Sequence, residues 1–433
     1  MRAALLLCLP CAAICACGQD SDPGPDGAQG NFPPPRVIPG GGIGDGAIDG
    51  VVNLYVIDDV TRTPVANATV RVGTLDGTTD ATGLFVANDV HGPQLVVAKA
   101  SGYRSEVWIG ANGANITVDL LKANTATPAS ATVTGQITGW AALPVTTGHA
   151  KVAIVGYSQS DDLGDEANNL KTPNDANICF TADTTSPCTF SVVTRTGKLA
   201  LIASVFDRAP DGTLTLVGWA ARQGVTASGT TAGQDLTLVS AASQATVTVN
   251  FGTPPASLST VAGIVGIDIG DEGVMQLPSI LTTSASSLLA PKLGAFSNAT
   301  GFRFTGFANN GATPTAQSVV LRRAQTGPTL DAGTWLDPPG GATASRTTAS
   351  WTNVTGATIH SLAYKQGATS VVNVSILDGS TSVTLPDIIA LPTGSLTVEV
   401  GAIGAPGLDL TNFALDTDRA KLAQAASSTV TLN

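Results

Sequence analysis

Residues 67–73 read NATVRVG, and their side chains alternate between polar and apolar. Ala68, Val70 and Val72 would point to one side of an extended chain, and the polar residues between them to the other. Successive side chains of a β-strand point to opposite faces of a sheet, so this alternation predicts a strand with one buried face. Similar short runs, separated by Gly, Asn and Asp, recur from residue 47 onwards. They predict an all-β chain of tandem β-sandwich modules.

The composition agrees with this fold class. The chain has 433 residues, enough for three or four domains, and only 12% of them are charged. Its net charge is −11, which excludes nucleic acid as a partner because too few cations are present to neutralise phosphates. Small and β-branched residues dominate and aromatic residues are few, as in secreted β-sandwiches.

The first 17 residues, MRAALLLCLPCAAICAC, form an apolar run after one Arg. The run is too short to cross a bilayer and predicts a secretory signal. Its end, Ile14-Cys15-Ala16-Cys17, resembles the lipobox of bacterial lipoproteins. This resemblance implies that Cys17 becomes an acylated N-terminus and that the protein is held at the bacterial cell envelope, in the outer membrane or at the cell surface. The alternative is an ordinary signal that is cleaved nearby.

The remaining cysteines form a pair. Cys8, Cys11 and Cys15 would leave with the signal, so that Cys179 and Cys188 remain outside the cytosol. Disulfides persist there, which predicts a bond between these two residues; two unpaired thiols are the alternative. Residues 18–45, rich in Gly, Pro and Asp, are expected to form a linker without a core of its own.

The clearest module follows the linker. In LDGTTDATGLFV (75–86), Asp76-Gly77 predicts a hairpin turn. Asp80 is expected to hydrogen-bond the backbone ahead of it, and Gly83 to adopt a positive φ. Phe85 is expected to return to the core.

The whole segment 46–123 resembles the carboxypeptidase regulatory-like domain, a transthyretin-like β-sandwich. The motifs that carry the resemblance are GVV (50–52), PVANATVRV (64–72), TDATGLF (79–85) and Gly102-Tyr103. It implies a non-catalytic module whose motif residues are turn formers and core positions.

Residues 130–242 are predicted to be a second, diverged copy of this sandwich. PV…AKVAIVG (144–156) corresponds to PV…ATVRVG, and GKLALIA (197–203) to GPQLVVA (92–98). An acidic loop over 158–178, with its far end held by the cysteine pair, is the candidate binding loop through Asp161, Asp162, Asp165 and Glu166. A calcium site in this loop is a weaker alternative to a solvated acidic surface.

Two further modules complete the chain. Residues 243–335 are β-rich without a recognisable family. Residues 341–433 contain WTNVTGATIHSLAY (351–364) and LPTGSLTVEVGA (391–402), and resemble fibronectin type III modules. The resemblance implies that Trp351 and Tyr364 are core residues, whereas a ligand-stacking role is the alternative.

Only one sequence pattern suggests catalysis. GYSQS (156–160) is one residue short of the nucleophile elbow G-x-S-x-G, because Ser160 replaces the second Gly. The copy in the first module ends its strand at the same Gly, so Ser158 is interpreted as the end of a strand. The histidines, His91, His149 and His360, show no metal-ligand spacing. No catalytic residue, metal or cofactor is therefore predicted.

Three functions remain open. The first is a non-catalytic, lipid-anchored envelope protein that binds or displays a glycan or another envelope protein. The second is an extracytoplasmic hydrolase using Ser158 or a pair of carboxylates, and the third is a structural spacer.

Overall fold

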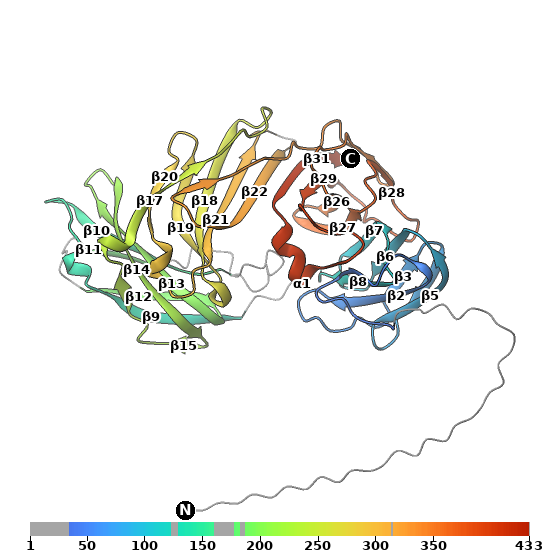
Figure 1. Cartoon of the computed structure of the whole chain (residues 1–433), viewed down its shortest axis with the longest axis horizontal. Coiled ribbons are helices and arrows are strands. Elements are labelled where there is room, and N and C mark those ends of the chain that lie inside the picture. Colours follow the sequence, from blue (N-terminus) through green and yellow to red (C-terminus); the bar gives the residue numbers. More distant parts are fainter. Residues whose placement is uncertain (1–33, 123–128, 160–176, 182–186, 313–314, 433) are drawn as a thin grey trace, which may run out of the picture. The chain divides into compact units, whose positions relative to one another are not determined.

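The computed structural model describes residues 34–122, 129–159, 177–181, 187–312 and 315–432 (Figure 1). Over these ranges the chain is all-β, as predicted. Its strands form two three-stranded sheets, a five-stranded, an eight-stranded and a twelve-stranded sheet. No helix in the described part of the chain is long and apolar enough to span a bilayer.

The first module is a sandwich of two sheet layers. Its strands are β1 (Gly42–Gly44), β2 (Asp49–Asp58), β3 (Thr69–Val72), β4 (Leu75–Thr78), β5 (Leu84–His91), β6 (Gln94–Lys99), β7 (Ser105–Ala111) and β8 (Asn115–Leu120). One layer has the order β1-β8-β2-β5 and the other the order β7-β6-β3-β4. Val52 and Leu54 of β2 pack against Val70 of β3 and Val96 of β6 in the core between them.

The alternation in NATVRVG decides which side of β3 is buried. Ala68, Val70 and Val72 are completely buried, whereas Asn67 is exposed. The prediction of a strand with one buried face is confirmed. Burial of such side chains contributes roughly 1.5–3 kcal/mol for each Val relative to an exposed position.

The predicted hairpin turn at Asp76-Gly77 is wrong. Val72 pairs with Leu75, so the turn lies three residues earlier, at Gly73-Thr74, and Gly73 has φ +60°. Gly77 instead lies inside β4, where a Cβ would stand only 2.1 Å from Cε2 of Phe85. The glycine thus makes room for the half-buried Phe85 ring, which packs against the core.

The turn that follows β4 matches its prediction. Asp80 accepts hydrogen bonds from the backbone nitrogens of Thr82, at 2.8 Å, and Leu84, at 3.0 Å. Gly83 has φ +75°.

The boundary of the predicted linker is also corrected. Residues 42–44 form β1 inside the segment 18–45, and Ile43 is completely buried in the core of the first module. Composition is misleading here because Gly42 is required for packing: a Cβ on it would lie 2.1 Å from the carbonyl oxygen of Phe413.

The second module repeats the strand pairings of the first. Its strands are β9 (Ser130–Thr138), β10 (Ala150–Tyr157), β11 (Asn177–Thr181), β12 (Cys188–Arg195), β13 (Gly197–Arg208), β14 (Leu214–Ala227), β15 (Thr230–Thr231) and β16 (Leu236–Leu238). In the first module β2 pairs with β8 and β5, and in the second module β9 pairs in the same way with β16 and β12. The strand order β7-β6-β3-β4 of the first module corresponds to the order β14-β13-β10-β11 of the second. β14 has 14 residues where β7 has 7, and it pairs with β16. One eight-stranded sheet therefore folds around a shared core, in place of two separate layers.

The third module places a three-stranded sheet opposite part of the twelve-stranded sheet. Its strands are β17 (Gln244–Asn250), β18 (Thr260–Asp268), β19 (Val274–Thr282), β20 (Ser287–Pro291), β21 (Gly301–Asn309), β22 (Ala316–Gln325) and β23 (Thr329–Asp331), with the 3₁₀ turn η4 (Gly270–Glu272). The layers have the orders β20-β17-β23 and β19-β18-β21-β22. Ala200, Ile202 and Trp219 of the second module belong to the same core, so the two modules share an interior.

The fourth module has a three-stranded layer, β24-β25-β28, and a four-stranded layer, β27-β26-β29-β31. Its elements are β24 (Thr343–Ala344), β25 (Thr348–Ser350), β26 (Ile359–Gln366), β27 (Thr369–Ile376), β28 (Ser382–Thr384), β29 (Leu396–Gly404), β30 (Phe413–Ala414), α1 (Leu415–Asp418), η6 (Arg419–Lys421) and β31 (Gln424–Leu432).

The twelve-stranded sheet crosses module boundaries. It joins the third module to the fourth through β22–β31, and the fourth to the first through the parallel pair β27–β7 (Figure 1). Val97 and Val107 of the first module are buried in the core of the fourth. The modules predicted from the sequence are therefore linked by strand pairing and by shared cores.

Candidate functional site

Ser158 is a packing residue at the end of β10. Its side chain is completely buried, donates a hydrogen bond to the carbonyl oxygen of Glu272, and accepts one from the backbone nitrogen of Ala200 at 2.9 Å. A nucleophile needs an accessible hydroxyl with a general base beside it. The Ser158 hydroxyl is inaccessible, and its two contacts are backbone groups.

The surroundings of Ser158 join the second and third modules. Gln159 and Val274 exchange two backbone hydrogen bonds of 2.8 Å each. Arg195 donates to the Glu272 carbonyl oxygen at 2.9 Å, and the Glu272 carboxyl accepts from the Gly224 nitrogen at 3.0 Å. Burial raises the pKa of Glu272. The stretch that resembled a nucleophile elbow is therefore a module junction.

His149 belongs to a turn. Its Nδ1 lies 2.7 Å from Oδ1 of Asp207, and Oδ2 of Asp207 accepts hydrogen bonds from the Thr146 hydroxyl at 2.7 Å and nitrogen at 2.9 Å. In a catalytic triad the nucleophilic hydroxyl contacts the histidine. Here the hydroxyl contacts the carboxylate, so these groups close the turn.

The aromatic residues predicted for the last core are buried there. Trp351 and Tyr364 are 6% and 0% exposed, and Trp351 packs against the buried His360, with ring centroids 5.7 Å apart. Burial raises the pKa of Tyr364 to about 12 and lowers that of His360. The core interpretation is confirmed, and burial contradicts the ligand-stacking alternative.

Several predicted site residues lie outside the described residues. They are the lipidation site Cys17 and the acidic-loop residues Asp161, Asp162, Asp165 and Glu166. Cys188 is buried in the second core, and the backbone of Cys179 pairs with Ala153 in β10–β11. The bond between these cysteines stays a prediction. Within the described ranges, no group of His, Cys, Asp and Glu side chains could hold a metal ion.

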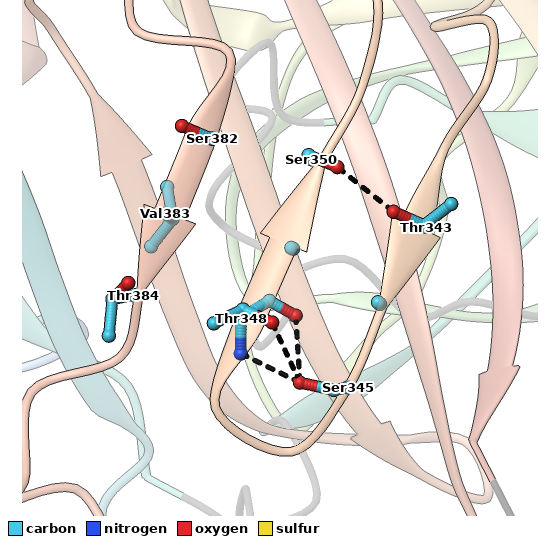
Figure 2. Close-up of a pocket in the computed structure, with 9 residues that line it drawn as sticks. Thr343, Ser345, Thr348, Ser350, Ser382, Val383 and Thr384 are labelled. Atoms are coloured by element: carbon cyan, nitrogen blue, oxygen red, sulfur yellow. Dashed lines mark hydrogen bonds between the residues drawn. The ribbon is translucent and has the colours of Figure 1, made fainter.

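A hydroxyl-lined depression lies on the three-stranded layer of the fourth module, where Figure 2 shows it from outside. Its volume is about 390 Å³. We call its exposed side chains the hydroxyl face: Thr343 and Ser345 at β24, Thr348 and Ser350 of β25, and Ser382 and Thr384 of β28. Between them, Ala349 and Val383 point into the core and are 4% and 5% exposed.

Strand register places these hydroxyls in rows. Ser350 lies opposite Thr343 on one side and Ser382 on the other, while Thr348 lies opposite Thr384. Neighbours across strands are about 5 Å apart and alternate residues along a strand about 6.7 Å. The face is therefore a two-dimensional array of side chains that donate and accept hydrogen bonds.

Hydrogen bonds hold part of this array in place. The hydroxyls of Thr343 and Ser350 lie 2.9 Å apart, as do those of Ser345 and Thr348 (Figure 2). The Thr348 nitrogen also donates to the Ser345 hydroxyl at 2.9 Å.

Among the residues that the structure describes, those that line the depression are Ser, Thr, Ala and Val, and none of them has an ionisable side chain. Its chemistry is suited to hydrogen bonding with a neutral, hydroxyl-bearing ligand and not to proton transfer. The sequence carries a signal for this face in Thr348-Ala349-Ser350 and Ser382-Val383-Thr384, where hydroxyl residues flank an apolar one.

Comparisons with known proteins do not identify the chain. No protein-family profile and no curated protein matches it. Among solved structures it is similar to the Bacillus anthracis TIE protein, with 8% identity and a TM-score of 0.14 over 65% of this chain and 49% of that chain. The match thus spans about half of the TIE protein.

Two further structures are similarly distant. The major pilin subunit of Bacillus cereus has 9% identity and a TM-score of 0.15 over 65% of this chain and 97% of its own. A Ca²⁺-stabilised, ice-binding adhesin of an Antarctic bacterium has 10% identity and a TM-score of 0.14 over 90% of this chain and 98% of its own. Scores this low carry no argument about the function of this chain.

Proposed function

We propose that this protein is a non-catalytic, lipid-anchored component of the bacterial cell envelope that presents a glycan-binding surface outside the cytoplasm. The lipobox-like end of residues 1–17 supports acylation of Cys17. The described part of the chain supports a binding role, because its interiors are packed hydrophobic cores and its hydroxyl face is open to solvent.

We further propose family relationships for three modules. The two layers of the first module and the strand order β7-β6-β3-β4 support a carboxypeptidase regulatory-like sandwich, and the repeated pairings support the second as its diverged copy. The layers β24-β25-β28 and β27-β26-β29-β31, with Trp351 and Tyr364 between them, support a fibronectin type III-like module.

The hydroxyl face is the observation that carries the binding proposal. Six exposed hydroxyls on three adjacent strands face solvent without a charged side chain among them. A sugar polymer repeats hydroxyl groups along its length, so an ordered hydroxyl array can exchange hydrogen bonds with several of its units. Because these contacts are neutral, their strength should not depend strongly on salt.

A glycan array probed with the mature full-length chain tests this function. We expect binding to neutral polysaccharides that is maintained when the ionic strength is raised. Absence of binding to every neutral glycan, or binding only to charged glycans at low salt, would contradict the proposal.

A structural spacer is the second candidate function. It is supported by strand pairing between modules, which transmits load through hydrogen bonds and shared cores. A spacer and a glycan-binding protein both require an anchor, so palmitate labelling that is lost in Cys17→Ser is expected in either case. Only the binding function predicts signals on the glycan array.

A further inference from the structure

The first and fourth modules meet in a contact that holds both ends of the folded chain together. β7 pairs with β27 over five residues, from Ser105↔Val372 to Ile109↔Ile376, and Ile43 of β1 pairs with Phe413 of β30. The Phe413 ring stacks on Trp108 with centroids 6.2 Å apart. We call this contact the terminal junction.

A buried carboxyl group lies within this junction. Glu106 on β7 is 6% exposed and stands opposite Asn373 of β27. Nε of Arg104 donates to the Glu106 carboxyl at 2.8 Å. With the Asn373 amide oriented so that its oxygen faces Arg104, that oxygen accepts from Nη2 at 2.9 Å. Arg104 thus connects a carboxyl of the first module to a side chain of the fourth.

Two more carboxyl groups lie close to each other beside the C-terminal segment. Asp119 of β8 and Asp59, which follows β2, are neighbouring carboxyl groups, and the charge of Asp59 disfavours ionisation of Asp119. Asp59 forms ion pairs with Arg62 at 3.1 Å and with Arg419 of η6 at 3.8 Å. Arg62 in turn pairs with Asp416 of α1 at 2.9 Å. The C-terminal segment therefore contributes both a cation and an anion to this cluster.

We propose that the terminal junction is a proton-dependent clasp: it closes with Glu106 and Asp119 protonated, and deprotonation of these two groups weakens it. Asp59 and Asp119 are neighbouring carboxyl groups that repel each other when both are ionised, which favours a proton on Asp119 in the closed junction. Glu106 is buried beside a single guanidinium, that of Arg104, which also contacts Asn373. This one contact only partly offsets the free energy of removing the ionised carboxylate from water. This device is independent of the proposed glycan binding.

The charges that act on Glu106 are those of Arg104, Asp119 and Asp59, and those that act on Asp119 are Asp59 and Arg419 of η6. Arg62 and Asp416 of α1 join the cluster through ion pairs with Asp59 and with each other. Burial raises the pKa of Glu106 to about 8 against the attraction of Arg104. Burial, followed by the charge of Asp59, also raises the pKa of Asp119.

The direction of the pH dependence follows from these shifts. A carboxyl whose pKa is raised by docking binds its proton more tightly in the docked state. Docking is therefore strongest at low pH and weakens as the pH rises from the ordinary carboxyl pKa, about 4.5, through the raised value of about 8.

Hydrogen exchange of the mature full-length chain tests the clasp. Protection factors of amides in β7 and β27, corrected for the intrinsic exchange rate at each pH, would be measured at pH 6 and pH 8.5. We expect at least a tenfold loss of protection in the wild type at the higher pH. The variant carrying Glu106→Gln and Asp119→Asn should lose less than threefold, because its amides mimic the protonated acids.

Glu399→Gln is the matched control, since Glu399 lies in β29 of the fourth module, which pairs with β26 and β31 and not with the junction strands β7 and β27, and its carboxyl forms an ion pair with Lys365. It should keep the wild-type loss of protection. Equal wild-type protection at both pH values, or an undiminished loss in the double variant, would overturn the proposal. If the double variant does not fold, Glu106→Gln alone should reduce the loss by at least threefold, and an unchanged loss in it counts against the clasp.

Discussion

Replacement of Ser158 by Ala separates a structural role from a catalytic one. The backbone nitrogen of the completely buried Ala200 donates a hydrogen bond to the Ser158 hydroxyl at 2.9 Å. The substitution removes this acceptor. The Glu272 carbonyl oxygen loses one donor but keeps Arg195 at 2.9 Å. A single orphaned buried amide costs about 1–3 kcal/mol, so we expect a destabilisation of about 2 kcal/mol.

Hydrogen exchange at the junction measures this cost locally, because a chain of several modules need not unfold in one step. A loss of about 2 kcal/mol should accelerate exchange of the Ala200 and Gln159 amides by about 30-fold. Ser287→Ala, at an exposed position of β20, is the control and should change stability by less than about 0.5 kcal/mol. Unchanged exchange in Ser158→Ala would refute the structural role, as would an esterase activity of the wild type that disappears in this variant.

The remaining predictions concern other buried groups. Tyr364→Phe should change stability by less than about 1 kcal/mol in urea unfolding, because the hydroxyl it removes is buried without a hydrogen-bond partner among the described residues. Trp219→Ala should cost about 3–5 kcal/mol and loosen both the second and third modules in limited proteolysis, since Trp219 lies in their shared core. Reduction of the predicted bond between Cys179 and Cys188 should cost roughly 2–3 kcal/mol, measured as a lower urea midpoint, and free thiols in the unreduced, denatured protein would argue against that bond. Between pH 5 and pH 8 the melting temperature should fall, since protonated Glu106 is favoured in the folded state. A rise of the wild-type melting temperature over this range would contradict this prediction, as would a fall in Glu106→Gln as large as that of the wild type.

Local pattern was sufficient to predict strands and their buried faces. In β3 the alternation alone identifies Val70 and Val72 as core residues. This prediction succeeds because side-chain direction in a strand depends on position along that strand and not on its partner. The burial of Trp351 and Tyr364 was instead predicted from the resemblance to fibronectin type III modules.

Pairing between distant strands could not be predicted. Nothing in SEVWIGA (105–111) specifies β27 as its neighbour, because any extended strand offers the same backbone donors and acceptors. Composition failed at β1 for a related reason: Gly42 is needed where the backbone of Phe413 approaches, yet the sequence around it resembles a linker.

The candidate site was missed because its residues are individually ordinary. Ser and Thr are common throughout this chain, and only the register of β24, β25 and β28 brings six of their hydroxyls onto one surface. Ser158 is misleading for the opposite reason, since its local motif suggests chemistry that its burial prevents.

The dissociation constant for a neutral polysaccharide, measured with hydroxyl-face variants of the full-length chain, tests the central claim most directly. Ser382→Lys and Thr384→Lys would place two long, charged side chains on this face, and Thr248→Lys is the matched control on an exposed hydroxyl pair of the other three-stranded sheet. The account predicts at least a tenfold weaker affinity for the Ser382→Lys, Thr384→Lys protein and an unchanged affinity for the control. Equal affinities of all three proteins would contradict it.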